Sequence, residues 1–75
     1  MSNETDPKPT FGDAVLAARL HHNLTQPQLC KLTGWRQPYL SRLENGGRTP
    51  REYTLHRLSD ALGEPISAIL ARVGL

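Results

Sequence analysis

Apolar residues recur along this chain at intervals of three and four positions, the spacing that keeps them on one face of an α-helix. The pattern covers residues 11–22, 26–32, 37–44, 50–62 and a last segment that opens at residue 65. No segment alternates apolar and polar residues with the period of two that is typical of a half-buried strand. The pattern therefore predicts an all-α domain of five helices without a sheet.

Residues that cap helices stand in front of three of these segments. Thr10 followed by Asp13 resembles a capping pair, and Thr25 precedes the second segment, where its hydroxyl can accept a hydrogen bond from a free main-chain N–H. The sequence TPRE at residues 49–52 gives the clearest start, because threonine stands at the cap, proline at the first helical position and glutamate three after the cap. We therefore expect the fourth helix to begin at Pro50.

The same spacing assigns leucines of the middle helices to the core. They are Leu29 and Leu32 in the second segment, Leu40 and Leu43 in the third, and Leu55, Leu58 and Leu62 in the fourth. Because the two leucines of the third segment share a face, its polar residues must point elsewhere. This outward face, the first indication of function, comprises Gln37, Pro38, Ser41, Arg42 and Asn45.

The chain has 75 residues, of which 37% are hydrophobic, so it can form one domain with a small core. Residues 1–9 are polar with two prolines, and we expect them to form a disordered arm before a folded domain at 10–75. Cys30 is the single cysteine, which excludes an internal disulfide. There is no apolar run of about 20 residues and no basic-then-apolar N-terminus, so a cytoplasmic protein without a membrane segment is the expectation.

Positive charge is concentrated in one part of the chain. The formal net charge is only +2, but residues 35–51 carry four arginines against Glu44 alone. This excess coincides with the outward polar face of the third segment, and a surface that binds a polyanion requires such a concentration. A merely solvated charged segment would have the same composition, so charge alone does not decide between the two.

Nothing in the sequence indicates catalysis, a cofactor or a metal ion. No serine or cysteine has a recognisable base and orienting partner, and no glycine-rich phosphate loop follows a strand. His21, His22 and His56 do not stand at ligand spacing with other cysteines or carboxylates. We interpret Cys30 as a small hydrophobe on the inner side of the second helix, a redox role being the alternative.

Two short helices joined by a glycine-containing turn, in TQPQLCKLTGWRQPYLSRLENG, are what a helix-turn-helix unit needs. Residues 11–70 resemble the phage repressor and Cro-like helix-turn-helix domains, which also occur in xenobiotic-response-type regulators and antitoxins. The resemblance is carried by LTQ at 24–26, Gly34, YLSRLENG at 39–46 and ALG at 61–63. It implies a compact five-helix, lambda-repressor-like domain in which the second and third helices form the helix-turn-helix.

By this resemblance the third helix lies in the major groove of double-stranded DNA, while the start of the second helix abuts the sugar-phosphate backbone. The residues expected to contact bases are Gln37, Pro38, Ser41 and Arg42. Glutamine can pair with an adenine edge and arginine with guanine, so Gln37 and Arg42 are our choices for direct readout. The residues expected to contact phosphates are Gln26, Arg36, Tyr39, Asn45, Arg48 and Arg51.

Arg19 and Glu44 match positions that form a salt bridge between the first and third helices in some family members. Three other residues depart from the family pattern. Arg36 replaces the usual serine or threonine cap of the recognition helix, so either that cap is lost or the helix starts one residue later with Gln37 as its cap. Trp35 replaces a smaller aliphatic residue and either fills the core or contacts DNA or a partner. A proline also replaces the polar cap of the last helix.

The resemblance implies a sequence-specific transcriptional regulator. We expect a repressor that binds a near-palindromic operator as a homodimer, because two copies double the few base contacts of one small domain. The possible dimer contacts are Ile69, Val73 and Leu75, although these residues could equally close the core. The alternatives are an antitoxin that binds a toxin as well as DNA, and a protein-interaction module that keeps the fold without using the groove-facing surface.

Overall fold

The computed structural model describes residues 8–47 and 49–75, and in this part the chain forms five helices and no strand. The helices are α1 (Phe11–His21), α2 (Gln26–Thr33), α3 (Gln37–Glu44), α4 (Glu52–Leu62) and α5 (Ile66–Ala71). The predicted all-α class and the five helices are therefore confirmed. Most of the arm predicted at residues 1–9 lies outside the described residues.

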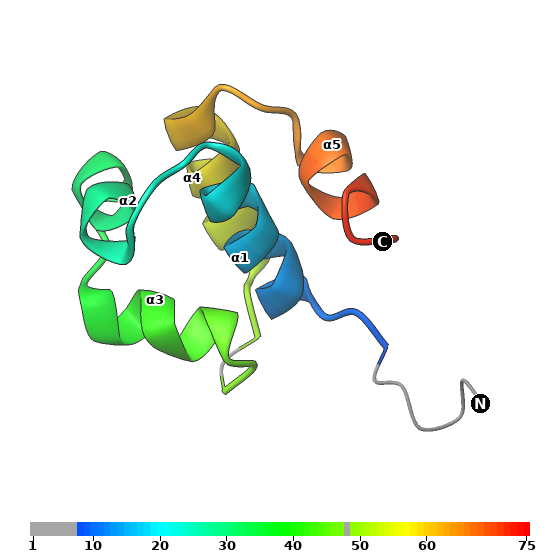
Figure 1. Cartoon of the computed structure of the whole chain (residues 1–75), viewed down its shortest axis with the longest axis horizontal. Coiled ribbons are helices and arrows are strands. Elements are labelled where there is room, and N and C mark those ends of the chain that lie inside the picture. The colour runs from blue at the N-terminus through cyan, green and yellow to red at the C-terminus, as the bar shows by residue number, and fades with distance from the viewer. Residues whose placement is uncertain (1–7, 48) are drawn as a thin grey trace.

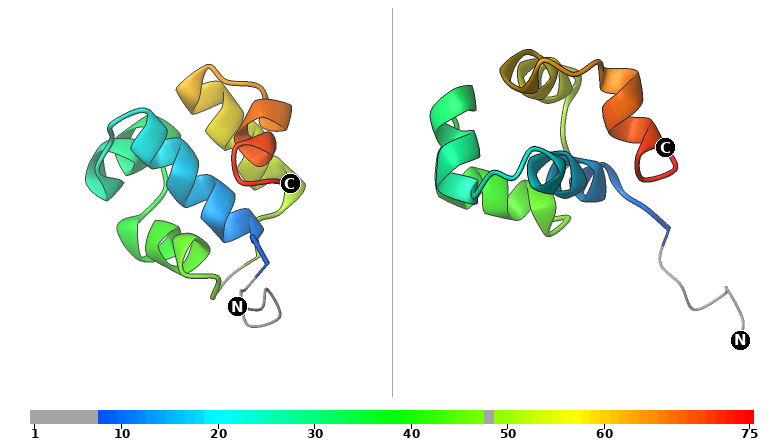
Figure 2. Two further views of the ribbon diagram at one scale, coloured as in Figure 1. Left: turned by 45° about the vertical axis from the view of Figure 1, so that its right-hand side comes forward. Right: turned by 45° about the horizontal axis from the view of Figure 1, so that its top comes forward.

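The helices are arranged around α1, as Figure 1 shows. α1 contacts both α3 and α5, α2 packs against α3 and α4, and α4 packs against α5. In Figures 1 and 2, α3 and the α4–α5 connection lie on opposite sides of α1. α3 thus lies at one edge of the domain. None of the helices in the described residues is both long and apolar enough to cross a membrane.

Seven apolar side chains, drawn from all five helices, form the core and are closed to solvent. They are Ala14, Val15, Ala18, Leu29, Leu40, Leu58 and Ile69. Ile69 lies fully within this core, so the expectation that it contacts a dimer partner is wrong, and the alternative that it closes the core is correct. Val73 packs partly buried against the same core.

The burial of α2 differs from the predicted pattern. Leu29 is fully buried, but 53% of Leu32 is exposed, so its expected inward position is wrong. The buried face of α2 passes through Leu29 and Thr33, four positions apart, and this leaves Leu32 at the rim. Thr33 is accommodated there because its hydroxyl donates to the main-chain oxygen of Leu29 at 3.0 Å.

The first two helices begin as their sequences predict. The hydroxyl of Thr10 accepts a hydrogen bond from the main-chain N–H of Asp13 at 3.1 Å, and the Asp13 carboxylate accepts one from the N–H of Thr10 at 2.9 Å. Thr25 and Gln28 make the same reciprocal pair at the start of α2. α2 ends at Gly34, whose φ of 82° lies in the left-handed region that glycine adopts without strain.

The predicted start of the fourth helix is wrong. α4 begins at Glu52, and Arg51 stands at its cap position without a side-chain cap hydrogen bond. Thr49 and Pro50 remain outside the helix, and Pro50 is buried. Burial of this proline ring beside the start of α1 has overridden the local capping pattern.

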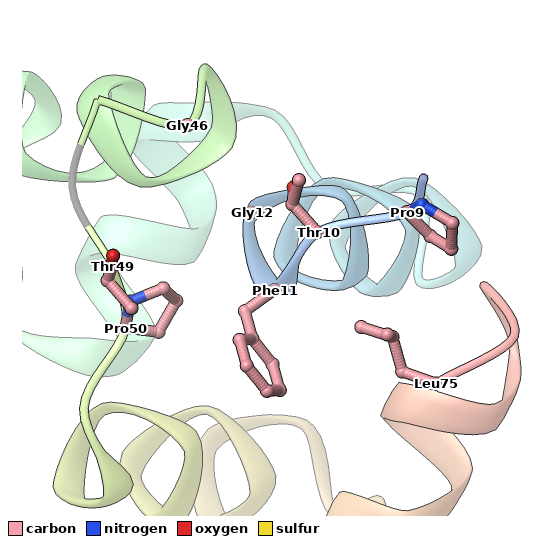
Figure 3. Close-up of a pocket in the computed structure, with 8 residues that line it drawn as sticks. All are labelled: Pro9, Thr10, Phe11, Gly12, Gly46, Thr49, Pro50 and Leu75. Carbon is pink, nitrogen blue, oxygen red and sulfur yellow. The ribbon is translucent and has the colours of Figure 1, made fainter. Parts of the chain in front are cut away.

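Pro50 borders a pocket of about 310 Å³ between the start of α1, the α3–α4 connection and the C-terminus. Figure 3 shows Pro50, Phe11 and Leu75 around the same space. The pocket is lined by Pro9, Thr10, Phe11, Gly12, Gly46, Thr49, Pro50 and Leu75. It therefore places the end of the chain next to the start of α1.

The α4–α5 connection is held by Glu64. Arg72 donates from Nη1 to Oε1 of Glu64 at 2.9 Å and from Nη2 to Oε2 at 2.6 Å. These hydrogen bonds hold the pKa of the Glu64 carboxyl below its usual value, so the group is ionised at neutral pH. The hydroxyl of Ser59 donates to the main-chain oxygen of Glu64 at 2.6 Å. Together these contacts fix the end of α4 relative to α5.

Gly12 lies buried where α1 passes the end of α3. A Cβ atom at this position would collide with the main-chain oxygen of Leu43. We expect Gly12→Ala to lower the free energy of unfolding by about 1–3 kcal/mol, because main-chain atoms must shift to make room. This loss runs against helix propensity, which favours alanine over glycine by about 1 kcal/mol. Urea unfolding followed by circular dichroism measures the change.

Gly47→Ala is the matched control. A Cβ atom on Gly47 would lie 3.7 Å from the main-chain oxygen of Arg42, an ordinary contact distance, and Gly47 does not have a positive φ. We expect this variant to unfold near the wild-type urea midpoint. Equal losses of stability in the two variants would contradict the proposed steric constraint at Gly12.

Candidate nucleic-acid interface

α3 follows α2 after a short turn and begins at Gln37. Arg36 occupies the cap position with φ −92° and ψ 148°, and its side chain makes no cap hydrogen bond. Of the two alternatives for Arg36, the loss of the cap is therefore the correct one, and the helix keeps its predicted start. Pro38 falls in the first turn, where its missing N–H has no intrahelical partner to lose.

The four residues predicted to contact bases lie on one side of α3. Gln37, Pro38 and Arg42 are exposed, and Ser41 is half-buried. The other side of the helix carries Leu40 and Leu43, both fully buried. The helix therefore presents its polar residues to solvent as its leucine spacing predicts.

Glu44 at the end of α3 is the centre of a buried polar network. Only 4% of its side chain is exposed, and 13% of that of Arg19. Arg19 on α1 donates to the two carboxylate oxygens of Glu44, from Nε at 2.6 Å and from Nη2 at 3.1 Å. Its remaining donor, Nη1, bonds to the main-chain oxygen of Leu24 at 2.9 Å. The salt bridge implied by the family resemblance is thus present.

Gln26 connects this salt bridge to the surface. Its Nε2 donates to Oε1 of Glu44 at 2.9 Å, and its Oε1 accepts a hydrogen bond from Nε2 of Gln37 at 3.2 Å. An ionised carboxylate can only accept hydrogen bonds, so Gln26 must turn its nitrogen towards Glu44 and its oxygen towards Gln37. Gln37 must in turn direct its nitrogen to Gln26. Glu44 therefore determines the orientation of the Gln37 amide.

Three arginines leave positive charge on the surface around α3. Arg36, Arg42 and Arg51 are exposed and make no ion pair within residues 8–47 and 49–75. The acidic residue of this segment, Glu44, is already neutralised by Arg19. The exposed charge is therefore more uniformly positive than the sequence count suggested. Arg48, also expected to contact phosphate, lies outside the described residues.

Tyr39 has a structural partner that the sequence pattern does not indicate. Its hydroxyl shares a hydrogen bond of 3.0 Å with that of Thr54, which is buried in α4. Its ring meets Trp35 edge to face, with centroids 5.6 Å apart. Trp35 packs partly against the core and also borders an open depression with Arg36, Tyr39 and Tyr53. Both rings thus help to hold the start of α3 against α4.

Cys30 packs half-buried against the core. Burial raises the pKa of its thiol, and the nearby negative charge of Glu44 raises it further. The reactive thiolate is therefore disfavoured at neutral pH. These surroundings agree with the interpretation of Cys30 as a small hydrophobe.

The structure brings together three residues that do not form a motif in the sequence. His21, His22 and Glu64 place potential ligand atoms within 4.8 Å of one another. The two histidines do not stand at ligand spacing with a carboxylate in the sequence, but the fold brings Glu64 next to them. Sequence spacing could not reveal the cluster, because it forms where the α4–α5 connection folds over the end of α1.

The domain matches a known class of protein. The family model described as helix-turn-helix covers residues 15–69, which include α2 and α3 and most of the described domain. The chain therefore belongs to the helix-turn-helix family of the Cro/C1 type, whose members bind DNA and regulate transcription. The described domain is therefore a helix-turn-helix DNA-binding domain of the kind that transcriptional regulators carry.

Proteins of similar sequence are described as HTH-type transcriptional regulators or repressors. Over 58 residues the chain is 38% identical to y4dJ of Sinorhizobium fredii, an uncharacterized HTH-type transcriptional regulator, covering 77% of this chain and 75% of that protein. Over 66 residues it is 33% identical to the HTH-type transcriptional repressor RghR of Bacillus subtilis, covering 87% of this chain. The chain spans only 49% of the length of RghR.

Two solved structures share the fold. The clp gene regulator ClgR from C. glutamicum aligns with a TM-score of 0.77 at 25% identity, over 84% of this chain and 82% of that one. The restriction-modification controller protein C.AhdI from Aeromonas hydrophila aligns with a TM-score of 0.71 at 25% identity, over 79% and 89%. The predicted lambda-repressor-like architecture is thereby confirmed.

Removal of the Glu44 carboxylate leaves Arg19 mostly buried without its charge partner. We expect Glu44→Ala to lower the free energy of unfolding by about 3–5 kcal/mol, the usual cost of breaking a buried ion pair from one side. The double variant Arg19→Met/Glu44→Leu should lose less free energy of unfolding than the single variants Arg19→Met and Glu44→Leu lose in sum, because it leaves no unpaired charge. Thermal and urea unfolding of all the variants measure both effects.

Glu52→Ala is the control for loss of a carboxylate. Glu52 is highly exposed, and its nearest basic partner is His56 at 3.8 Å. Exposed pairs of this kind contribute little to stability. We therefore expect this variant to unfold like wild type. If Glu44→Ala were equally harmless, the central role of the buried network would be wrong.

Proposed function

We propose that this protein is a repressor that binds a near-palindromic DNA operator as a homodimer, with α3 in the major groove. One observation carries the proposal. The exposed polar face of α3 combines Gln37 and Arg42, two side chains suited to reading bases, with a surrounding positive surface. The likeness to RghR, described as a repressor, supports the direction of regulation.

Gln37 and Arg42 are the proposed base readers. With its amide oriented by Gln26, Gln37 keeps its oxygen and one N–H for DNA, and this acceptor and donor match the N6–H and N7 edge of adenine. Arg42 can bind O6 and N7 of guanine. Ser41 adds a hydroxyl close to them, and Pro38 offers apolar contact suited to a thymine methyl group.

The proposed phosphate contacts surround this face. Gln26 is the first residue of α2, where free N–H groups and the helix dipole favour an anion. Arg36 and Arg51 stand at the cap positions of α3 and α4. The full proposed set is Gln26, Arg36, Tyr39, Asn45, Arg48 and Arg51. These contacts would position the protein on DNA without selecting a base sequence.

The proposed dimer contact is the C-terminal tail. Val73 is half-buried, and 48% of Leu75 is exposed. Leu75 lies beside the exposed Phe11 at the rim of the pocket in Figure 3, so the two side chains offer apolar surface to a second copy. A domain this small gains from such burial, because its own core is limited.

Selection of bound duplexes from a randomised DNA pool tests the proposal. It should be performed with folded protein at about 0.15 M salt, where nonspecific phosphate binding is weakened. The expected product is an inverted repeat whose half-sites lie about 10–10.5 base pairs apart, or a multiple of that distance. A failure to enrich any sequence would contradict the proposed function.

Arg42→Ala should weaken binding to the selected operator by about 1–3 kcal/mol and relax preference at one base pair. The physical reason is the loss of two hydrogen bonds to a guanine edge. Titrations of the operator and of duplexes with single substitutions measure both effects. Arg57→Ala removes an exposed arginine from α4 and is the control for net charge. Equal behaviour of the two variants would refute the base-reading role of Arg42.

Gln26→Met tests the orientation of Gln37 while it leaves the Arg19–Glu44 salt bridge in place. Methionine has a similar volume but cannot direct the Gln37 amide, so we expect the preference for adenine to fall at the base pair that Gln37 reads. In a Gln37→Met background the same replacement should leave the remaining base preferences unchanged, because the two residues act as one unit. Weaker binding to all sequences alike would indicate only a phosphate contact. Operator titrations with all four base pairs at that position give the answer.

A further inference from the structure

Three potential metal ligands converge where the end of α1 meets the α4–α5 connection. His21 is the last residue of α1, His22 is its C-cap, and Glu64 follows the glycine that ends α4. One ring nitrogen of each histidine and one oxygen of Glu64 lie within 4.8 Å of one another. Within residues 8–47 and 49–75, this is the one group of three or more such ligands. None of them belongs to the proposed DNA surface.

The Nε2 atom of His22 is a buried polar atom without a hydrogen-bond partner. Almost all buried polar atoms in native proteins have a partner, so this nitrogen requires an explanation. The closest carboxylate oxygen, Oε2 of Glu64, lies at 3.4 Å, the distance of an ion pair with a protonated imidazole, but no well-aligned hydrogen bond joins the two atoms. An ion bound between the two atoms would give this nitrogen a partner.

The distance between these two atoms suits a tetrahedral zinc ion. Protein nitrogen and carboxylate oxygen atoms bind Zn²⁺ at about 2.0–2.2 Å, so two ligands of one tetrahedral ion lie about 3.4 Å apart. His22 and Glu64 already have this separation. His21 is exposed and free of the core, so rotation of its ring can supply the third ligand. Water can complete the coordination.

Arg72 opposes a cation at this place electrostatically, because its guanidinium binds both oxygens of Glu64. Each carboxylate oxygen has two lone pairs, so Oε2 can accept a hydrogen bond from Arg72 and still bind an ion. Such hydrogen bonds to metal-binding carboxylates are usual and fix their orientation. The negative end of the α1 dipole, at His21 and His22, attracts a cation.

We propose that His21, His22 and Glu64 bind one divalent transition-metal ion per chain. Zn²⁺ is the best match, because imidazole nitrogen and carboxylate oxygen are ligands it takes readily in tetrahedral geometry. The ion would join the end of α1 to the α4–α5 connection, on the side of α1 away from α3 (Figures 1 and 2). It would therefore stabilise the domain without contacting the bound DNA. This proposal is independent of the proposed repressor function.

Isothermal titration of Zn²⁺ into the full chain, in a buffer that does not bind metal, tests the site. We expect one ion per chain and a higher thermal unfolding midpoint in its presence. His22→Gln should weaken binding by more than the roughly tenfold that loss of an outer partner already costs. His56→Gln is the control, because His56 lies 3.8 Å from Glu52 but has no third ligand. The control should bind Zn²⁺ like wild type.

His21→Gln keeps the test decisive if the His22 variant fails to fold. His21 is exposed, so its replacement should leave the fold intact, and only a ligand role predicts weaker Zn²⁺ binding. Binding of Co²⁺ should produce the intense visible absorption of a tetrahedral complex, and both variants should lose it. Absence of Zn²⁺ binding at concentrations on the order of 1 mM would overturn the proposal. Zn²⁺ binding unchanged by His21→Gln would overturn it too, because the ion would then be held without His21.

Discussion

The structure depends most on one buried charge, the carboxylate of Glu44. It ends α3, accepts hydrogen bonds from Arg19 on α1 and Gln26 on α2, and so joins the three helices that meet behind the recognition surface. Removal of an ionised group from water is costly unless charge and hydrogen bonds compensate, and here both do. Because the same carboxylate also directs the Gln26 and Gln37 amides, the stability of the domain and the chemistry that it offers to DNA are coupled.

Local patterns predicted the helices well because periodicity and capping act between residues close in sequence. α3 begins at Gln37 although its cap is lost, since its leucine spacing and first-turn proline are sufficient. The prediction was wrong where packing competes with local preference. Pro50 is buried in the α3–α4 connection instead of starting α4, and Leu32 lies outside the face through which α2 packs. Neither outcome can be read from neighbouring residues alone.

In the candidate site, too, local sequence pattern predicted some features, and packing between distant residues set the others. The exposed face of α3 follows from the position of its leucines, and the resemblance implied the pair of Arg19 and Glu44. The bond between Tyr39 and Thr54, and the approach of His22 to Glu64, join residues far apart in sequence. Such contacts depend on the angle and distance at which helices cross, which the order of polar and apolar residues does not define.

The position of α1 between α3 and α5 bears on how a dimer would fit DNA. α1 contacts α3 on one side and α5 on the other, and Gly12 allows its main chain to approach the end of α3 closely. An α-helix with its side chains is about 10–12 Å across. In a dimer joined through the C-terminal tails, α1 would separate the tail from the recognition helix by this width. The width would then help to decide which half-site separations the two copies can span.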